Sequence, residues 1–265
     1  MVHYEVTNDI AWVTLQRPEK QNALSFEMFK QLDKIIKVIR SDHSIRAVFL
    51  QGEGEHFCAG LDVKSVTKRP MQILKLLAKI LPGNQNLVQR IVLGWRTLPI
   101  PVYAILQGNC LGGGLHIALG ADFRIAKSNT QVAIMESRWG LCPDMGTSII
   151  IPSYIRQDNA LLLAMNAERI NAQRAQELGI ITTITDEPKK YVEQQVDALR
   201  HHSPDALAAI KLLYNQAYQQ PSRKLLWLET WYQIKLLSSK NTRIAMKNGV
   251  KNSDTQPYQK RTRWK

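Results

Sequence analysis

Cysteine is scarce in this sequence, and long apolar runs are missing. The three cysteines, Cys58, Cys110 and Cys142, are odd in number and widely spaced. Neither a disulfide framework nor a zinc or other metal site is therefore expected, which fits a reducing compartment. No stretch of about 18 or more apolar residues occurs, so we expect no membrane span. The first residues lack a basic segment followed by an apolar one, so we expect no secretory signal and a cytoplasmic protein.

Acidic residues are also few: 22 Asp and Glu stand against 35 Lys and Arg, which gives a net charge of +13. This excess favours anionic partners such as nucleic acid, anionic lipid or a polyanionic small molecule. It is uneven, because residues 240–265 carry eight basic side chains and one acid, Asp254. A solvated basic tail explains the same pattern. No zinc finger, RNA-recognition motif or basic zipper is present, so nucleic acid is not the expected partner.

The most distinctive stretch is Gly108 to Asp122, which follows the short apolar run 102–106. Three consecutive glycines, 112–114, lead into an apolar segment that suits a buried helix. A glycine turn lets main-chain N–H groups approach a ligand, and the helix start adds partial positive charge. The turn is suited to a phosphate, a carboxylate or an oxyanion. The alternative is a tight turn that only needs room to pack.

A second glycine turn, His56 to Asp62, also joins a strand region to a helix start, where Asp62 can cap residues 63–66. Two separate turns, each with a main-chain N–H, can hold one oxygen from two sides. That arrangement stabilises the negative charge that develops when a carbonyl becomes an enolate. The pair of turns therefore favours an oxyanion site over simple packing.

Enolate chemistry also needs a group that moves protons at the neighbouring carbon. Glu136 is the main candidate, because it follows the apolar run 132–135 and burial is expected to raise its pKa. Asp144 lies eight residues later, between Pro143 and Gly146. Each carboxylate could instead be a surface or capping group. His116 lies in the expected buried helix, where a lone histidine is more often a core residue than a catalytic one.

Short strands alternate with helices in the first part of the chain, which indicates an α/β body of about 190 residues followed by helices. An Asn8-Asp9 turn between two alternating runs predicts a hairpin. The expected strands are residues 3–6, 10–15, 47–50, 102–106, 123–126, 131–134 and 180–184. The expected helices are a Ser25-capped one through residue 39, then 71–81, 86–95, two buried ones at 149–154 and 159–165, 171–178, 189–200, 204–218, 222–237 and 242–247.

Several of these motifs together resemble the crotonase superfamily, the enoyl-CoA hydratase/isomerase family. Arg17-Pro18 with residues 22–24 resembles the family's early signature, and Phe57 to Asp62 resembles its first oxyanion turn. Gly112 to Gly114 resembles the second turn, and Asp122 with Arg124 fits the strand that follows. The resemblance implies that the Ala59 and Gly113 N–H groups form the oxyanion hole.

The same resemblance implies a fold and a ligand. Residues 1–190 would form a crotonase-type ββα spiral core, and residues 191–265 a helical region that packs in homotrimers or hexamers. The ligand would be an acyl-CoA thioester, with no separate cofactor because coenzyme A is part of the substrate. Its phosphates would use the basic excess, including Lys64 and the C-terminal segment. The residues implied in substrate and CoA binding are Ala59, Gly60, Leu61, Asp62, Val63, Lys64, Gly112 and Gly113.

One departure from the family pattern concerns the reaction. Hydratases in this family use two glutamates, which correspond here to His116 and Glu136. Isomerases that move a double bond can rely on one glutamate at the Glu136 position, and dienoyl-CoA isomerases add an aspartate at the Asp144 spacing. We therefore expect double-bond isomerisation in fatty-acid metabolism, with Glu136, Asp144 and His116 as the catalytic candidates. The alternatives are hydration with His116 in place of the first glutamate, and a non-catalytic or RNA-binding relative.

Overall fold

The computed structural model describes residues 1–62, 70–79, 81, 83–217, 220–250 and 255–264. Its main sheet has the strand order β1-β2-β3-β4-β6-β9. The strands are β1 (Val2–Thr7), β2 (Ile10–Leu15), β3 (Ala47–Gly52), β4 (Val102–Leu106), β6 (Phe123–Ala126) and β9 (Thr183–Ile184). Only β1 and β2 pair antiparallel, and every later neighbour is parallel. This topology confirms the predicted α/β body.

The predicted hairpin and first helix both form for local reasons. Asn8 and Asp9 have φ angles of 51° and 62°, the left-handed conformation that a tight hairpin between twisted strands requires. Helix α1 (Phe26–Ser41) begins after Ser25, whose hydroxyl accepts a hydrogen bond from the Met28 N–H. Its apolar side chains at helical spacing are buried against the sheet. Short-range signals in the sequence were sufficient for both elements.

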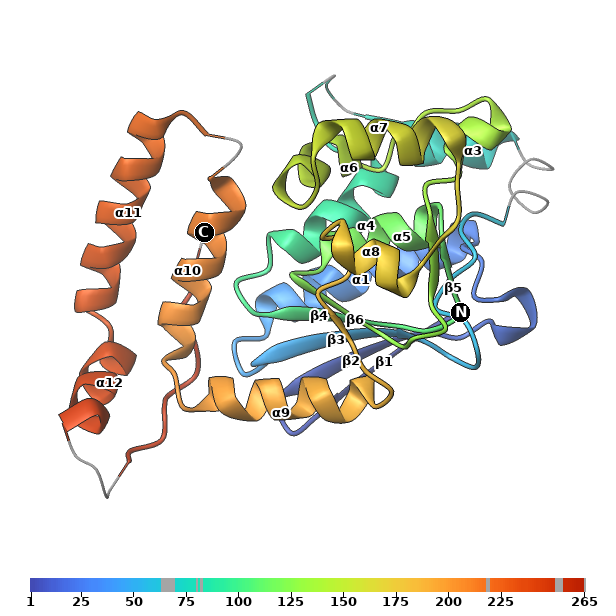
Figure 1. The fold of residues 1–265 in the computed structure, drawn as a ribbon. Helices are drawn as coiled ribbons and strands as arrows, with labels where there is room; N and C mark the ends of the chain where they lie inside the picture. The colour runs from blue at the N-terminus through green and yellow to red at the C-terminus, as the bar shows by residue number, and fades with distance from the viewer. Residues whose placement is uncertain (63–69, 80, 82, 218–219, 251–254, 265) are drawn as a thin grey trace.

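Helices cover the two faces of the main sheet unequally (Figure 1). The larger core lies on the side of α1, α4 (Leu87–Arg96) and α5 (Gly113–Gly120). On the other face, α9 (Pro188–Arg200) packs Val192 and Val196 against Phe49, Tyr103 and Ile125 of the sheet. The expected boundary between residues 190 and 191 therefore falls inside a helix that belongs to the body.

A second, three-stranded sheet has the order β5-β7-β8, and sequence patterns did not predict two of its strands. It consists of β5 (Asn109–Leu111), β7 (Gln131–Ala133) and β8 (Ile170–Asn171). Strands of two or three residues are too short to show an alternating pattern, which explains why β5 and β8 were missed. Because β5 and β7 pair in parallel with Leu111 opposite Ala133, the chain segments that follow both strands lie side by side.

The remaining helices follow the predicted order. They are α3 (Pro70–Leu77), α6 (Thr147–Ile150), α7 (Gln157–Asn166), α8 (Ala172–Glu177), α10 (Pro204–Gln216), α11 (Ser222–Leu237) and α12 (Lys240–Val250), with one-turn helices η1 (Pro18–Lys20), η2 (Glu136–Trp139) and η3 (Ile151–Ser153). Helix α11 has the predicted bounds, α7 and α12 are longer, and α3, α8 and α10 are shorter. The helix predicted at 159–165 forms as α7, but its expected burial was wrong, because Leu161, Leu162 and Met165 are exposed and only Leu163 is buried among the described side chains of this helix. The helix predicted at 71–81 ends at Leu77. The strand predicted at 180–184 is reduced to β9.

The C-terminal helices α10, α11 and α12 stand beside the body in Figure 1. The buried Lys211 of α10 joins the two parts: its ammonium donates to the carbonyl oxygens of Trp95 (3.0 Å) and Ile100 (2.8 Å) and pairs with Asp122 (2.7 Å). On α11, Trp227 and Trp231 are stacked and exposed together with Leu226, Ile234 and Leu237. Assembly of the chain into trimers or hexamers stays a prediction.

Residues 255–264, which we call the C-terminal arm, return to these helices and are held by Asp205 at the start of α10. The Asp205 carboxylate is buried and accepts five hydrogen bonds, all between 2.7 and 3.2 Å. The donors are the side chains of Ser239, Asn241 and Trp264 and both the backbone N–H and the hydroxyl of Thr262. One carboxylate thus ties α10, the start of α12 and the arm together.

In the part of the chain that the structure describes, no helix is both long and apolar enough to cross a membrane.

Candidate active site

The two predicted glycine turns lie against each other in the fold. Cys58, in the first turn, forms a parallel bridge with Cys110, just before the second. The Cys58 N–H donates to the Asn109 carbonyl oxygen and the Leu111 N–H donates to the Cys58 carbonyl oxygen, both at 2.9 Å. Main-chain hydrogen bonds therefore hold the two turns against each other, and the His56 ring adds a further one by accepting from the Asn109 N–H at 3.1 Å.

Two glycines of the second turn are required by the backbone. Gly112 has a φ of 47°, in the region that favours glycine, and its N–H donates to Ala133 at 2.8 Å. At Gly114 a Cβ atom would lie 2.5 Å from the Cys58 carbonyl oxygen, so no larger residue fits against the first turn. Helix α5 starts between them at Gly113, which points the positive end of its dipole toward the site.

The free N–H groups are not the predicted pair. The Ala59 N–H donates to the Gln21 carbonyl oxygen at 2.9 Å, so it is not available to a ligand. Among the described residues, the N–H groups of Leu61 and Gly113 have no acceptor. They lie close together, because a Cβ on Gly113 would sit 3.9 Å from the Leu61 nitrogen. The geometry therefore favours Leu61 with Gly113 as the oxyanion donors, in place of Ala59 with Gly113.

Replacing Gly113 with alanine tests this assignment. The new methyl would contact Leu24 Cδ1 at 3.1 Å and Met145 Sδ at 3.4 Å, beside the two free N–H groups. We expect turnover to fall about 100-fold, as when one oxyanion donor is lost, while the protein still folds. Steady-state kinetics and thermal unfolding measure the two effects. Gly83→Ala is the matched control, because a Cβ there meets nothing within 4 Å; equal activity of both variants would contradict the assignment.

Glu136 and His116 are brought together by the pairing of β5 with β7. Glu136 follows β7 at the start of η2, and His116 lies on the first turns of α5. The His116 Nε2–H donates to Glu136 Oε1 at 2.8 Å, and His116 Nδ1 lies 2.5 Å from the Thr147 hydroxyl. His116 and Thr147 are fully buried, whereas 15% of the Glu136 side chain is exposed. His116 is thus a partner of Glu136 and not an isolated core histidine.

The pKa of Glu136 moves opposite to the prediction. Burial alone acts to raise the pKa of this carboxyl, but the hydrogen bond from His116 opposes burial, and the pKa lies below its usual value. Oε1 accepts from His116, and Oε2 is shielded from solvent with no hydrogen-bond partner among the described residues. An ionised carboxylate with one free, poorly solvated oxygen is suited to act as a general base.

The pKa of Asp144 is shifted in the opposite direction to that of Glu136. It lies in the loop after η2, and although its side chain is exposed, the surrounding protein desolvates it and raises its pKa. The negative charge of Glu136 adds to this increase. The two carboxyls are close enough to interact electrostatically, and their pKa values are moved apart. Such a pair can divide the roles of base and acid.

The predicted CoA-binding residues are described only in part. Leu61 is partly exposed beside the free N–H groups, and Asp62 pairs with Arg17 at 2.8 Å. Val63 and Lys64, and the helix turn predicted at 63–66, lie outside the described residues. Sequence patterns missed Thr147, since its contact with His116 spans 31 residues and leaves no local signal.

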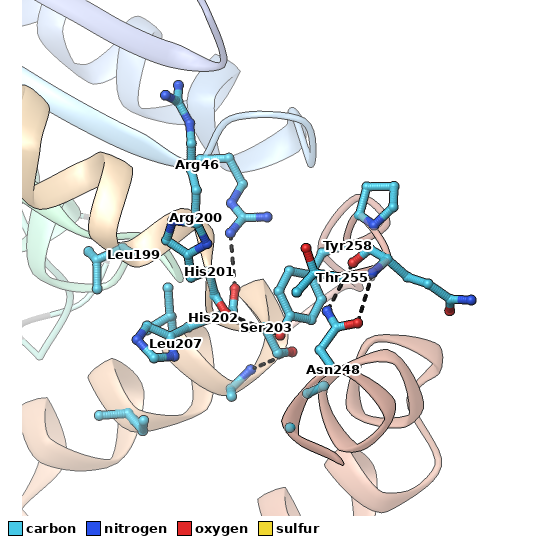
Figure 2. A pocket seen from close by; sticks show the side chains of 16 residues that line it. Arg46, Leu199, Arg200, His201, His202, Ser203, Leu207, Asn248, Thr255 and Tyr258 are labelled. Atoms are coloured by element: carbon cyan, nitrogen blue, oxygen red, sulfur yellow. Dashed lines mark hydrogen bonds between the residues drawn. The ribbon is translucent and has the colours of Figure 1, made fainter. Parts of the chain in front are cut away.

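A cavity of about 950 Å³ lies elsewhere, at the corner between α9 and α10 and next to the C-terminal arm (Figure 2). Its two guanidinium groups are already engaged: Arg46 donates to the His202 carbonyl oxygen, and Arg200 pairs with Asp9 and Asp197. No residue of the glycine turns or of the Glu136 cluster lines it. We therefore do not assign the chemistry to this cavity.

The spiral of strands and helices, with two facing glycine turns and an adjacent glutamate, is the crotonase fold. A solved enoyl-CoA hydratase structure from Polaromonas sp. JS666 superposes with a TM-score of 0.85 at 26% identity, over 97% of this chain and 99% of that one. The profile described as enoyl-CoA hydratase/isomerase matches residues 5–255. The chain belongs to the enoyl-CoA hydratase/isomerase family.

Curated relatives include both hydratases and isomerases. The 1,2-epoxyphenylacetyl-CoA isomerase of Escherichia coli (strain K12) is 30% identical over 232 residues, which cover 86% of this chain and 87% of the relative. The (E)-benzylidenesuccinyl-CoA hydratase of Thauera aromatica is 32% identical over 186 residues, or 70% of each protein. These similarities support a family enzyme that binds acyl-CoA, and they do not separate the two reactions.

Proposed function

We propose that the protein moves a double bond in an unsaturated acyl-CoA by way of a thioester enolate. One observation carries the choice of reaction: the position of the first hydratase glutamate is occupied by His116, and both ring nitrogens of His116 are already hydrogen-bonded, to Glu136 and Thr147. A buried imidazole with both nitrogens engaged is a poor group to hold and activate a water. Isomerisation needs only a proton taken from one carbon and returned to another.

In the proposed reaction the Glu136 carboxylate removes a proton from the α carbon of a 3-enoyl-CoA. The electrons of that C–H bond pass into the conjugated system, and the thioester oxygen becomes an enolate oxygen. The Leu61 and Gly113 N–H groups donate to that oxygen as its charge grows. Glu136 then returns the proton to the γ carbon, so the double bond ends next to the thioester and no atom is gained or lost.

Asp144 extends the proposal to dienoyl substrates. Its raised pKa makes it the more readily protonated of the two carboxyls, and Glu136, with its lowered pKa, is the more readily ionised. A base and an acid at different points along the acyl chain suit a proton shift over a longer conjugated system. The second candidate function is hydration, which the same raised pKa of Asp144 supports, because an acid is needed to protonate the α carbon.

A paired assay with purified protein tests the proposal. Crotonyl-CoA is supplied while loss of the conjugated absorbance is followed, and 3-enoyl-CoA and 3,5-dienoyl-CoA are supplied while conjugated product appears. We expect isomerisation of at least one of the latter substrates with little hydration of crotonyl-CoA. Efficient hydration would mean that Asp144 or His116 replaces the missing glutamate and that isomerisation is the wrong reaction.

A further inference from the structure

Thr147, His116 and Glu136 form a hydrogen-bonded line of hydroxyl, imidazole and carboxylate. The two links measure 2.5 Å at Nδ1 and 2.8 Å at Nε2 of His116. The order of groups matches a nucleophilic triad, in which the hydroxyl faces the substrate. In this protein the opposite end of the line is accessible: Thr147 and His116 are fully buried, and the Glu136 carboxylate is partly exposed.

The carboxylate end is also the one beside the glycine turns. A Cβ on Gly112 would lie 3.7 Å from Glu136 Oε1, next to the Gly113 N–H. Thr147 is the first residue of α6, behind His116. The hydroxyl therefore cannot be the group that meets a thioester held in this site, and the line is anchored at Thr147 and acts at Glu136.

Hydrogen positions follow from the available partners. His116 is the one partner of the Thr147 hydroxyl among the described side-chain and backbone acceptors, so the hydroxyl proton is directed at Nδ1. Nδ1 then accepts, and in the neutral ring the proton must be on Nε2. The Nε2–H in turn donates to Glu136, which as an ionised carboxylate can only accept.

We propose that Thr147 is a positioning residue: its hydroxyl fixes His116 as the neutral Nε2–H tautomer, which holds Glu136 ionised with one oxygen free for the substrate proton. This inference rests on the proposed function and adds what positions its general base, Glu136. Without the Thr147 hydroxyl the ring loses one of its two anchors, and the contact with Glu136 alone then specifies the ring orientation and the nitrogen that carries the proton.

Loss of the Thr147 hydroxyl should shift the pH dependence of kcat/KM in a defined direction. The titratable groups that face Glu136 are His116 on α5 and Asp144 on the following loop. A base works when ionised, so its activity is lost as the pH falls through its pKa. If His116 holds Glu136 less well, burial acts with less opposition and the Glu136 pKa rises. The acid limb of kcat/KM then moves to higher pH.

Thr147→Val and Thr147→Ser test the proposal, since valine keeps the shape and serine keeps the hydroxyl. We expect Thr147→Val to lower kcat about 10- to 100-fold with KM little changed, and to move the acid limb upward. Thr147→Ser restores both values. In ¹⁵N NMR, wild type and Thr147→Ser show His116 protonated at Nε2, and Thr147→Val shows a mixture of tautomers. The His116 signals are identified by their loss in His116→Gln.

The NMR result does not depend on turnover, so the two proposals fail separately. If no isomerase substrate is consumed but the tautomer still changes in Thr147→Val, the proposed function fails and the role of Thr147 stands. An unchanged tautomer and an unchanged pH profile in Thr147→Val overturn the positioning role. Release of free CoA by wild type that is lost in Thr147→Val also overturns it, because Thr147 would then be a nucleophile.

Discussion

Glu136→Gln should remove nearly all turnover while the protein keeps its fold and still binds acyl-CoA. The amide oxygen of glutamine can accept the His116 Nε2–H as Glu136 Oε1 does, so the local structure is retained. Glutamine cannot take up a proton, however, and a positioned general base contributes about 10²- to 10⁴-fold. We expect kcat to fall about 1,000-fold in the isomerase assay, with a small change in KM.

Glu177→Gln is the control for this experiment. Glu177 is an exposed residue paired with Arg174, and it lies far along the chain from both glycine turns. Its loss should leave activity and stability nearly unchanged. If Glu136→Gln turned over every acyl-CoA substrate at the wild-type rate, Glu136 would not be the base, and Asp144 would become the first candidate.

Asp205→Ala should produce the largest loss of stability. The substitution removes the acceptor of five buried hydrogen bonds and leaves the side-chain donors of Ser239, Asn241 and Trp264 without it. Buried donors without acceptors are costly, so we expect the free energy of unfolding to fall by about 3–5 kcal/mol. Chemical denaturation measures this loss, and trypsin should cleave the C-terminal arm at Arg261, which is buried in the wild type.

The stabilisation by Asp205 should depend on pH in a defined direction. Burial acts to raise the pKa of Asp205, but hydrogen bonds from Asn241, Thr262 and Ser239 outweigh it, so the folded-state pKa lies below the ordinary 3.8. A group with a depressed pKa stabilises the fold fully above its unfolded pKa and loses that contribution as pH falls through the folded value. The difference in the free energy of unfolding between wild type and Asp205→Ala should therefore become smaller as the pH falls through the folded-state pKa of Asp205.

Asp197→Asn is the matched control for Asp205→Ala. Asp197 pairs with Arg200, but its side chain is 65% exposed, and exposed ion pairs contribute about 0–1 kcal/mol. Equal losses of stability for the two variants would show that Asp205 does not hold the arm in the way described. Resistance of Asp205→Ala to trypsin would lead to the same conclusion.

Elements specified by neighbouring residues could be predicted from the sequence, and contacts between distant residues could not. The strand at 102–106 and the Ser25 cap depend on residues that are close neighbours in the sequence, and both formed as expected. The engagement of the Ala59 N–H depends on the carbonyl of Gln21, which lies in another segment. The exposure of α7 likewise depends on what packs above it, which apolar spacing does not reveal.

In the candidate site, too, features specified by neighbouring residues could be predicted and contacts between distant residues could not. The two glycine turns and Glu136 stand out in the sequence because glycine runs and an acid after an apolar run are unusual. The direction of the Glu136 pKa could not be predicted, because burial and the His116 hydrogen bond act in opposite directions. Their balance requires the distance between two residues that are 20 positions apart.

The pairing of Cys58 with Asn109 and Leu111 through the main chain has a consequence for how this kind of protein can change over time. The groups that stabilise the negative oxygen are main-chain N–H groups, and glycines and main-chain hydrogen bonds place them. The groups that move protons are three side chains that substitution can replace, at positions 116, 136 and 144. A descendant could therefore exchange one reaction for another at those positions and inherit the oxygen-binding groups intact.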